Sequence, residues 1–228
     1  MADVLLDHPS WMVNDEGVAY RAVRSGSSIW SVTGTPSVDG DRQVRISQVF
    51  GSGTAPVLDV FDPSVLIGID VVVSPLRAAG PVGRLRNPDV WDAVAASILR
   101  QVIRAGQARK LYRVFCHAYG EAVTTPGGEA WMFPVPETVL ALPDTEFARL
   151  GMAFKRRPLQ AAAQAVLEFG PQWATLDPTE LVQEVQAVPR IGPWTAGASV
   201  ADLTNDYALY PFADLAVRTW AKCLAPGR

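Results

Sequence analysis

The character of the sequence changes near residue 82, and this change constrains the fold more than any other feature. The residues before it form short runs rich in β-branched side chains, separated by clusters of Gly, Pro and Asp. Runs of this kind with tight turns between them are typical of antiparallel strands. We expect strands at residues 18–24, 29–32, 44–50 and 71–73.

The chain after this point carries signals for helices. Asn87 is a candidate helix cap, followed by a proline and an acidic residue, and almost no helix breaker occurs before Gly120. Further helices are expected at residues 144–150, at 155–170 and from residue 177. We predict an α+β protein with a small antiparallel sheet domain at residues 1–82 and a helical domain at residues 83–228.

Composition excludes several classes of site. The chain has two cysteines and two histidines, so it can form neither a four-cysteine iron–sulfur cluster nor a zinc site built on several histidines. We expect no metal and no organic cofactor. Acidic residues interrupt both the N-terminal residues and the most hydrophobic window, 65–76. This argues against a membrane segment and favours a cytoplasmic protein.

Residues 185–198 predict two helices joined by a tight turn. The turn runs from Pro189 to Gly192, and the second helix opens at Pro193. Such a turn directs backbone N–H groups and a positive helix end outward, so it suits a DNA phosphate and requires no particular base. Further along the chain, Asp214 follows a proline turn at the head of another helix.

This hairpin and aspartate resemble those of the helix-hairpin-helix DNA glycosylase superfamily. The 3-methyladenine DNA glycosylase II branch is the most similar, because it also places a small sheet domain before a helical one. Three further segments resemble motifs of that branch in the same order. They are 95–102, similar to a helix ending in Leu-Gly-Gln and an apolar residue, 133–137, similar to Phe-Pro-x-Pro, and 150–156, similar to a Leu-Gly-x-x-x-Lys turn.

The resemblance implies that Asp214 is the catalytic carboxylate, which stabilises positive charge on the deoxyribose as the base leaves. The alternative is that Asp214 only caps its helix. Superfamily members that also cleave the DNA backbone carry a lysine where this chain has Trp194, so lyase chemistry is not expected. Trp194 is instead a candidate surface for stacking a flipped base, or a core residue of its helix.

The resemblance also implies a DNA-binding set. Gln101 and Val102 fall where the branch fills the gap left by the flipped nucleotide, and the alternative is an ordinary helix end. Residues 81–120 carry seven basic and two acidic side chains, within a chain of net charge −3. Solvated helix charges are the default explanation for such a run, but its place beside the proposed wedge favours phosphate binding. The basic residues concerned are Arg100, Arg104, Arg109, Lys110 and Arg113.

Two features depart from the pattern. In the hairpin, Val188, Arg190 and Gly192 are the candidate DNA contacts, but Arg190 stands where the superfamily usually has glycine. A positive φ there costs a non-glycine residue on the order of 1 kcal/mol, and the side chain could add a phosphate contact or obstruct one. The chain also ends soon after Asp214, where the branch normally adds another helix that closes the base pocket.

We therefore predict a monofunctional DNA glycosylase that hydrolyses the N-glycosidic bond of a damaged purine in double-stranded DNA. Alkylated purines are the favoured substrates, because cationic bases are good leaving groups. The alternatives are a non-catalytic DNA-binding or damage-sensing protein and a protein-interaction module. A monomer is expected, unless a partner completes the helical domain.

Overall fold

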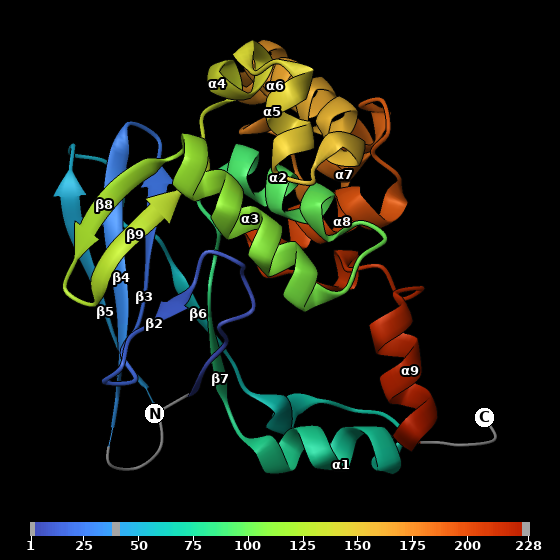
Figure 1. The fold of residues 1–228 in the computed structure, drawn as a ribbon. Helices are drawn as coiled ribbons and strands as arrows, with labels where there is room; N and C mark the ends of the chain where they lie inside the picture. The colour runs from blue at the N-terminus through green and yellow to red at the C-terminus, as the bar shows by residue number, and fades with distance from the viewer. Residues whose placement is uncertain (1–2, 38–41, 225–228) are drawn as a thin grey trace.

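The computed structural model describes residues 3–37 and 42–224, and the protein has the expected α+β class. Strands lie mainly in the first part of the chain and helices in the second, with a short hairpin between helices as the exception (Figure 1). The strands are β1 (Asp3–Val4), β2 (Met12–Val13), β3 (Ala19–Ser25), β4 (Ser28–Pro36), β5 (Arg42–Phe50), β6 (Leu58–Phe61), β7 (Val82–Leu85), β8 (Glu121–Thr125) and β9 (Gly128–Met132).

Three of the four expected strands are confirmed. They are β3, β4 and β5, which form an antiparallel sheet together with the short β2, and in it Val23 lies opposite Trp30 and Val32 opposite Ile46. A second sheet, β1-β7-β6, contains one parallel pair, between β1 and β7. The hairpin β8–β9 packs on β3, although the sequence predicts only helices and turns in that part of the chain.

The fourth expected strand, at residues 71–73, is wrong, because these valines lie in helix α1 (Asp70–Ala79). Strands β6 and β7 pair directly with each other, from Leu58 opposite Leu85, and residues 71–73 lie in the connection between them. Of the three valines only Val73 is buried, so the run does not form the core of a sheet. Its backbone groups therefore bond locally, as a helix, since unpaired backbone groups are costly.

The helices build the second part of the molecule. They are α2 (Val90–Arg100), α3 (Ala105–Tyr119), α4 (Pro136–Ala141), α5 (Asp144–Arg149), α6 (Ala153–Trp173), α7 (Pro178–Ala187), α8 (Pro193–Thr204) and α9 (Leu215–Leu224). Their core includes Ile98, Leu99, Phe115, Leu159 and Val200, all fully buried. The division of the chain into domains at residue 82 stays a prediction.

The cap of α2 differs from the expectation. Asp89, not Asn87, caps the helix, and its carboxylate accepts from the backbone N–H groups of Trp91 at 2.9 Å and Asp92 at 3.3 Å. Asn87 is buried instead and donates to Asp92 at 3.0 Å and to Asp202 at 2.9 Å. A buried amide is stable only when hydrogen-bonded, and these carboxylates keep Asn87 out of the cap.

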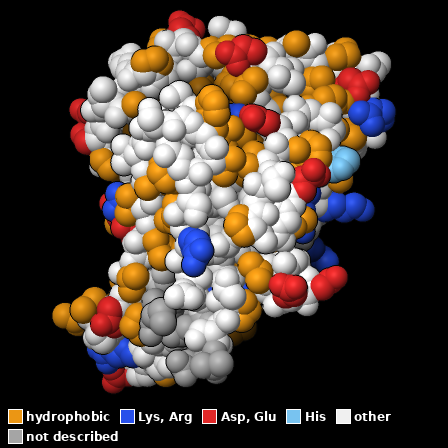
Figure 2. Space-filling view, turned by 90° about the vertical axis from the view of Figure 1, so that its left-hand side faces the viewer, with side chains coloured by type: hydrophobic (Ala, Val, Ile, Leu, Met, Phe, Trp, Pro, Cys, Tyr) orange, Lys and Arg blue, Asp and Glu red, His pale blue; other side chains and the backbone are white. Residues whose placement is uncertain are grey.

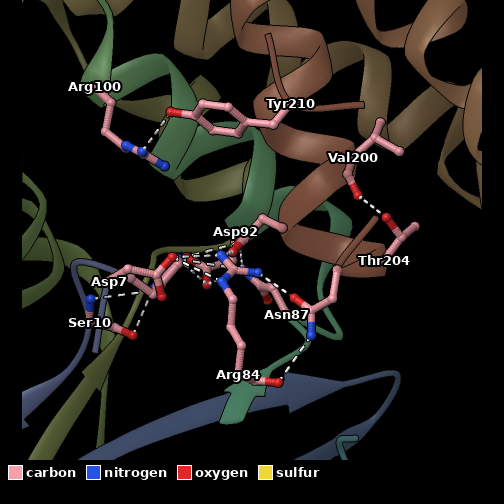
Figure 3. A network of polar contacts seen from close by, with 12 residues as sticks. Asp7, Ser10, Arg84, Asn87, Asp92, Arg100, Val200, Thr204 and Tyr210 are labelled. Atoms are coloured by element: carbon pink, nitrogen blue, oxygen red, sulfur yellow. Dashed lines mark hydrogen bonds and ion pairs between the residues drawn. The ribbon is translucent and has the colours of Figure 1, made fainter. Parts of the chain in front are cut away.

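A buried polar network joins the small sheet to the helices (Figure 3). Arg84 of β7 donates to Asp7 at 2.9 Å and to Asp202 of α8 and Asn205, each at 2.5 Å. The pKa of Arg84 is raised because the carboxylates of Asp202 and Asp7 outweigh the effect of burial. Since Arg84 and Asp202 are far apart in sequence, this ion pair fixes α8 against the strand.

His8 extends this network in an uncharged form. Its ring contacts Ser10 at 2.8 Å and lies 3.4 Å from a carboxylate oxygen of Asp92. Burial, and then the nearby charge of Arg21, lower the pKa of His8 well below its ordinary value. Burial also raises the pKa of Asp92 to about 6, so this carboxyl group takes up a proton at a higher pH than an ordinary aspartate.

We expect His8→Gln to lose less unfolding free energy than the wild type as pH falls from 7.5 to 5.5. Below pH 6.5 the unfolded chain protonates His8 and the folded chain does not, so the contribution of His8 to the free energy of unfolding falls as pH falls, by at most about 1.4 kcal/mol per pH unit. Asp92 contributes in the opposite direction, because its raised pKa lets the folded chain bind a proton that the unfolded chain does not, and the comparison with the wild type isolates His8. Urea unfolding between pH 7.5 and 5.5 measures this slope. His117→Gln, at the exposed second histidine, is the control and should keep the wild-type slope. An identical slope in His8→Gln would show that His8 is charged in the fold.

Candidate active site

Asp214 lies immediately before α9 and is held from three directions. Its Oδ1 accepts from the backbone N–H groups of Ala216 at 2.7 Å and Val217 at 3.3 Å, so it does cap the helix. Its Oδ2 accepts from the indole N–H of Trp194 at 2.6 Å and from the hydroxyl of Tyr210 at 3.1 Å. The helix-cap interpretation therefore describes only one of its two oxygens.

These donors keep Asp214 ionised. Partial burial acts to raise the pKa of Asp214, but the hydrogen bonds from Trp194, the two backbone N–H groups and Tyr210 outweigh it, and the pKa lies below its ordinary value. Burial raises the pKa of Tyr210, so its hydroxyl keeps its proton. The result is a half-buried carboxylate that carries its charge at neutral pH.

The ring of Trp194 is half-buried and borders this carboxylate. It meets Tyr210 edge to face, with 6.5 Å between ring centres, and the guanidinium of Arg100 lies 5.6 Å from the centre of the Trp194 ring. Arg100 also reaches the hydroxyl of Tyr210 at 3.5 Å (Figure 3). We call Arg100, Trp194, Tyr210 and Asp214 the Asp214 cluster.

A glycine allows the cluster to assemble. A Cβ atom at Gly197 of α8 would lie 2.5 Å from the backbone oxygen of Leu209. No larger residue fits there, so glycine lets the segment that carries Tyr210 cross directly over α8. No sequence motif pointed to Tyr210 as a site residue. The available signal was its position four residues before Asp214, close enough along the chain for contact.

The hairpin has the predicted form, with α7 and α8 joined by a tight turn. Arg190 is exposed and has φ 70°, which is the backbone conformation that glycine usually supplies. Gly192 is exposed at the start of α8. Val188 differs from the expectation of a DNA contact. Its side chain is buried in the helical core and its N–H and C=O groups bond within the turn, so it shapes the hairpin from inside.

The proposed wedge residues lie beside this hairpin. Gln101 donates to the hydroxyl of Thr195 at 2.8 Å and to the backbone oxygen of Arg190 at 3.4 Å. Val102 has φ 65° and a fully exposed side chain, at 101%. A β-branched residue with positive φ is a rare, strained arrangement, and one that also exposes an apolar side chain points to a function.

Lys155, from the segment 150–156, supports the wedge from the core. Its ammonium donates to the backbone oxygens of Ile98 at 2.7 Å and Gln101 at 2.8 Å, and its side chain is almost fully buried. Burial lowers the pKa of Lys155 to about 8. In the sequence this lysine stands out only as part of a motif. In the structure it binds the carbonyl groups at the end of α2.

The basic run divides into two groups. Arg109 donates to the backbone oxygen of Leu6 at 3.0 Å, and Arg113 bonds to those of Pro9 and Trp11, so both hold the N-terminal segment, contrary to their expected role toward DNA. Arg104 and Lys110 are exposed.

On the face with the strands, the visible described residues show acidic and basic side chains interspersed (Figure 2).

Within residues 3–37 and 42–224, which the structure describes, no helix is long and apolar enough to cross a membrane. Nor do these ranges bring together three or more His, Cys, Asp or Glu side chains in an arrangement able to hold a metal ion.

Comparison with known structures identifies the fold. A 3-methyladenine DNA glycosylase from Archaeoglobus fulgidus matches with a TM-score of 0.71 and 19% identity, over 95% of this chain and 78% of that one. MBOgg1 in complex with a low-affinity DNA ligand matches with a TM-score of 0.73 and 16% identity, over 100% and 82%. The chain has the fold of the helix-hairpin-helix DNA glycosylases.

A sequence match agrees with this fold assignment over a shorter part of the chain. A DNA-3-methyladenine glycosylase of Bacillus subtilis (strain 168) is 23% identical over 132 residues, which are 56% of this chain and 44% of that protein. The match thus spans less than half the length of that relative. No protein-family profile matches the chain. The fold that the motif resemblance implies is confirmed.

Two substitutions of Val102 distinguish its effect on stability from its effect on DNA binding. We expect Val102→Gly to raise the free energy of unfolding by up to about 1 kcal/mol, because glycine adopts positive φ without strain. The same variant should bind a duplex with an abasic site more weakly, since the apolar wedge is lost. Val102→Ala is the matched control: it loses most of the apolar side chain, keeps a Cβ at positive φ and should gain less stability than Val102→Gly. Urea unfolding and fluorescence anisotropy measure the two effects, and unchanged DNA affinity in both variants would remove Val102 from the interface.

Proposed function

We propose that the protein is a DNA glycosylase of base excision repair, which hydrolyses the N-glycosidic bond of damaged purines in double-stranded DNA. The ionised carboxylate of Asp214 carries this proposal. It accepts a hydrogen bond from the half-buried ring of Trp194, and the exposed apolar side chain of Val102 protrudes from the same helical part of the protein. The names of the similar proteins support it. The expectations of a monomeric and cytoplasmic protein belong to this proposal.

Binding begins at the hairpin in this proposal. The exposed start of α8 at Gly192 offers backbone N–H groups to a DNA phosphate, and Arg190 and Arg104 add positive charge. Val102 enters the duplex and fills the gap left by the flipped nucleotide, while Gln101 ties this wedge to the hairpin. The flipped base stacks on Trp194.

Chemistry then occurs at the deoxyribose. The bond between C1′ and N9 breaks, its electron pair goes to the base, and C1′ gains positive charge. The negative charge of Asp214 stabilises this cation, and a water adds to C1′ and releases a proton. Because four hydrogen bonds hold the carboxylate before the substrate arrives, little reorganisation is needed during the reaction.

We expect Asp214→Asn to reduce base release by at least about a hundredfold, because the variant loses the charge that stabilises the sugar cation. Asparagine also caps helices well, so α9 and the fold should be retained. Single-turnover release of bases from alkylated DNA measures the effect, with undamaged DNA as the control. Binding to an abasic duplex should stay within a few-fold of wild type. Turnover close to wild type would exclude Asp214 from the reaction and favour the non-catalytic alternatives.

A second test concerns the absence of lyase chemistry. Trp194 occupies the position of the nucleophilic lysine of bifunctional superfamily members, and the ammonium of Lys155 is engaged by two backbone oxygens. We expect no covalent complex with an abasic duplex after borohydride reduction, measured by denaturing electrophoresis. Trp194→Lys is a matched comparison that introduces an amine at this position. A borohydride-trapped wild-type complex that disappears in Lys155→Met would contradict the monofunctional assignment.

A further inference from the structure

Arg100 brings a positive charge into the Asp214 cluster, and the proposed chemistry does not yet use it. It is the last residue of α2, and its guanidinium approaches both the face of the Trp194 ring, at 5.6 Å from the ring centre, and the Tyr210 hydroxyl, at 3.5 Å. In Figure 3 its side chain points toward Tyr210. In the Leu-Gly-Gln motif that this helix end resembles, Arg100 stands at the position of the glycine.

Among residues 3–37 and 42–224, no carboxylate pairs directly with Arg100. Among the described residues, the ion pairs involve other arginines, while Arg100 is linked to Asp214 only through the shared hydroxyl of Tyr210. The guanidinium is also only partly exposed, which limits screening by water. Arg100 therefore keeps hydrogen-bond donors for a ligand, next to the ring on which a flipped base would stack, and its charge is separated from that of Asp214 by the Tyr210 hydroxyl.

The two charged side chains of the Asp214 cluster, Asp214 and Arg100, would act on different parts of a nucleoside. As the bond between C1′ and N9 breaks, the sugar becomes positive and Asp214 stabilises it. A neutral purine receives the electron pair and becomes an anion, which water then protonates. A cationic N-alkylated purine receives the same pair and leaves neutral. Positive charge beside the base thus stabilises the departure of a neutral purine, and it repels a cationic purine on binding.

We propose that Arg100 is a specificity-determining residue that directs the site toward neutral damaged purines with a carbonyl oxygen and away from cationic alkylated ones. The guanidinium donates to the carbonyl oxygen, such as O6 of hypoxanthine, and this bond strengthens as negative charge develops on the leaving base. The inference rests on the proposed glycosylase function. It argues against the preference for cationic alkylpurines that the sequence suggested, because that preference took no account of a charge at the pocket.

Two defined lesions test the inference. Single-turnover base release is measured on matched duplexes that contain either hypoxanthine or 7-methylguanine, the first neutral and the second cationic. We expect Arg100→Gln to lower the rate for hypoxanthine relative to that for 7-methylguanine by about tenfold or more, the scale of a charged hydrogen bond. Arg100→Lys keeps the charge and should retain most of the wild-type ratio. Arg104→Gln removes an exposed neighbouring charge and should slow both substrates alike.

Binding provides an independent readout. Asp214→Asn and the double variant Asp214→Asn, Arg100→Gln are compared for affinity to the same two duplexes. Equal effects of Arg100→Gln on both lesions, in rate and in affinity, would overturn the inference and leave the glycosylase proposal intact. Absence of release from every lesion by the wild type, with a lesion-dependent affinity change in the double variant, would overturn the glycosylase proposal and support Arg100 as a reader of base charge.

Discussion

The geometry of the candidate site depends on one carboxylate that several elements share. Asp214 accepts hydrogen bonds from the start of α9, from Trp194 of α8 and from Tyr210. Each donor restricts where the others can lie, because a carboxylate has a limited number of acceptor directions. The donors also keep the group ionised in a half-buried place, where its charge acts more strongly than in water. The same contacts therefore assemble the site and maintain the charge that the proposed chemistry requires.

Contacts in the interior fix the position of helix α8, which carries one of the hydrogen-bond donors to this carboxylate. Trp194 lies near one end of the helix, and Asp202, near the other end, pairs with Arg84 in the buried polar network. Breaking a buried ion pair is costly, because the remaining charge is left without a partner. The position of the indole N–H that meets Asp214 is thus fixed by contacts far from the carboxylate. His8 and Asp92 surround the same network and link it to pH.

The end of α2 combines rigidity with strain. Lys155 holds the last carbonyl groups of the helix, and Gln101 connects it to the hairpin. On this support, Val102 and Arg190 both adopt positive φ, which neither side chain favours. Strain of this kind persists when the surrounding contacts outweigh it, and it concentrates at surfaces that bind. The two strained residues lie on segments joined by a hydrogen bond, from Gln101 to the Arg190 carbonyl, so the wedge and the hairpin form one connected surface.

The sequence by itself determined the elements whose signals are local. Turn residues and alternation predicted β3 to β5, and the proline and glycine pattern predicted the hairpin before α8, because both depend on the preferences of neighbouring residues. It also pointed to Asp214 and Val102 through a resemblance of motifs. Tertiary structure alone decided which partners each side chain meets. Valines 71–73 lie in a helix of the β6–β7 connection, with only Val73 buried, and the side chain of Val188 lies in the core. Arg109 and Arg113 bound the N-terminal segment, whereas Arg100 met Trp194 and Tyr210. These outcomes arise from contacts between residues far apart in the chain, and no local pattern encodes them.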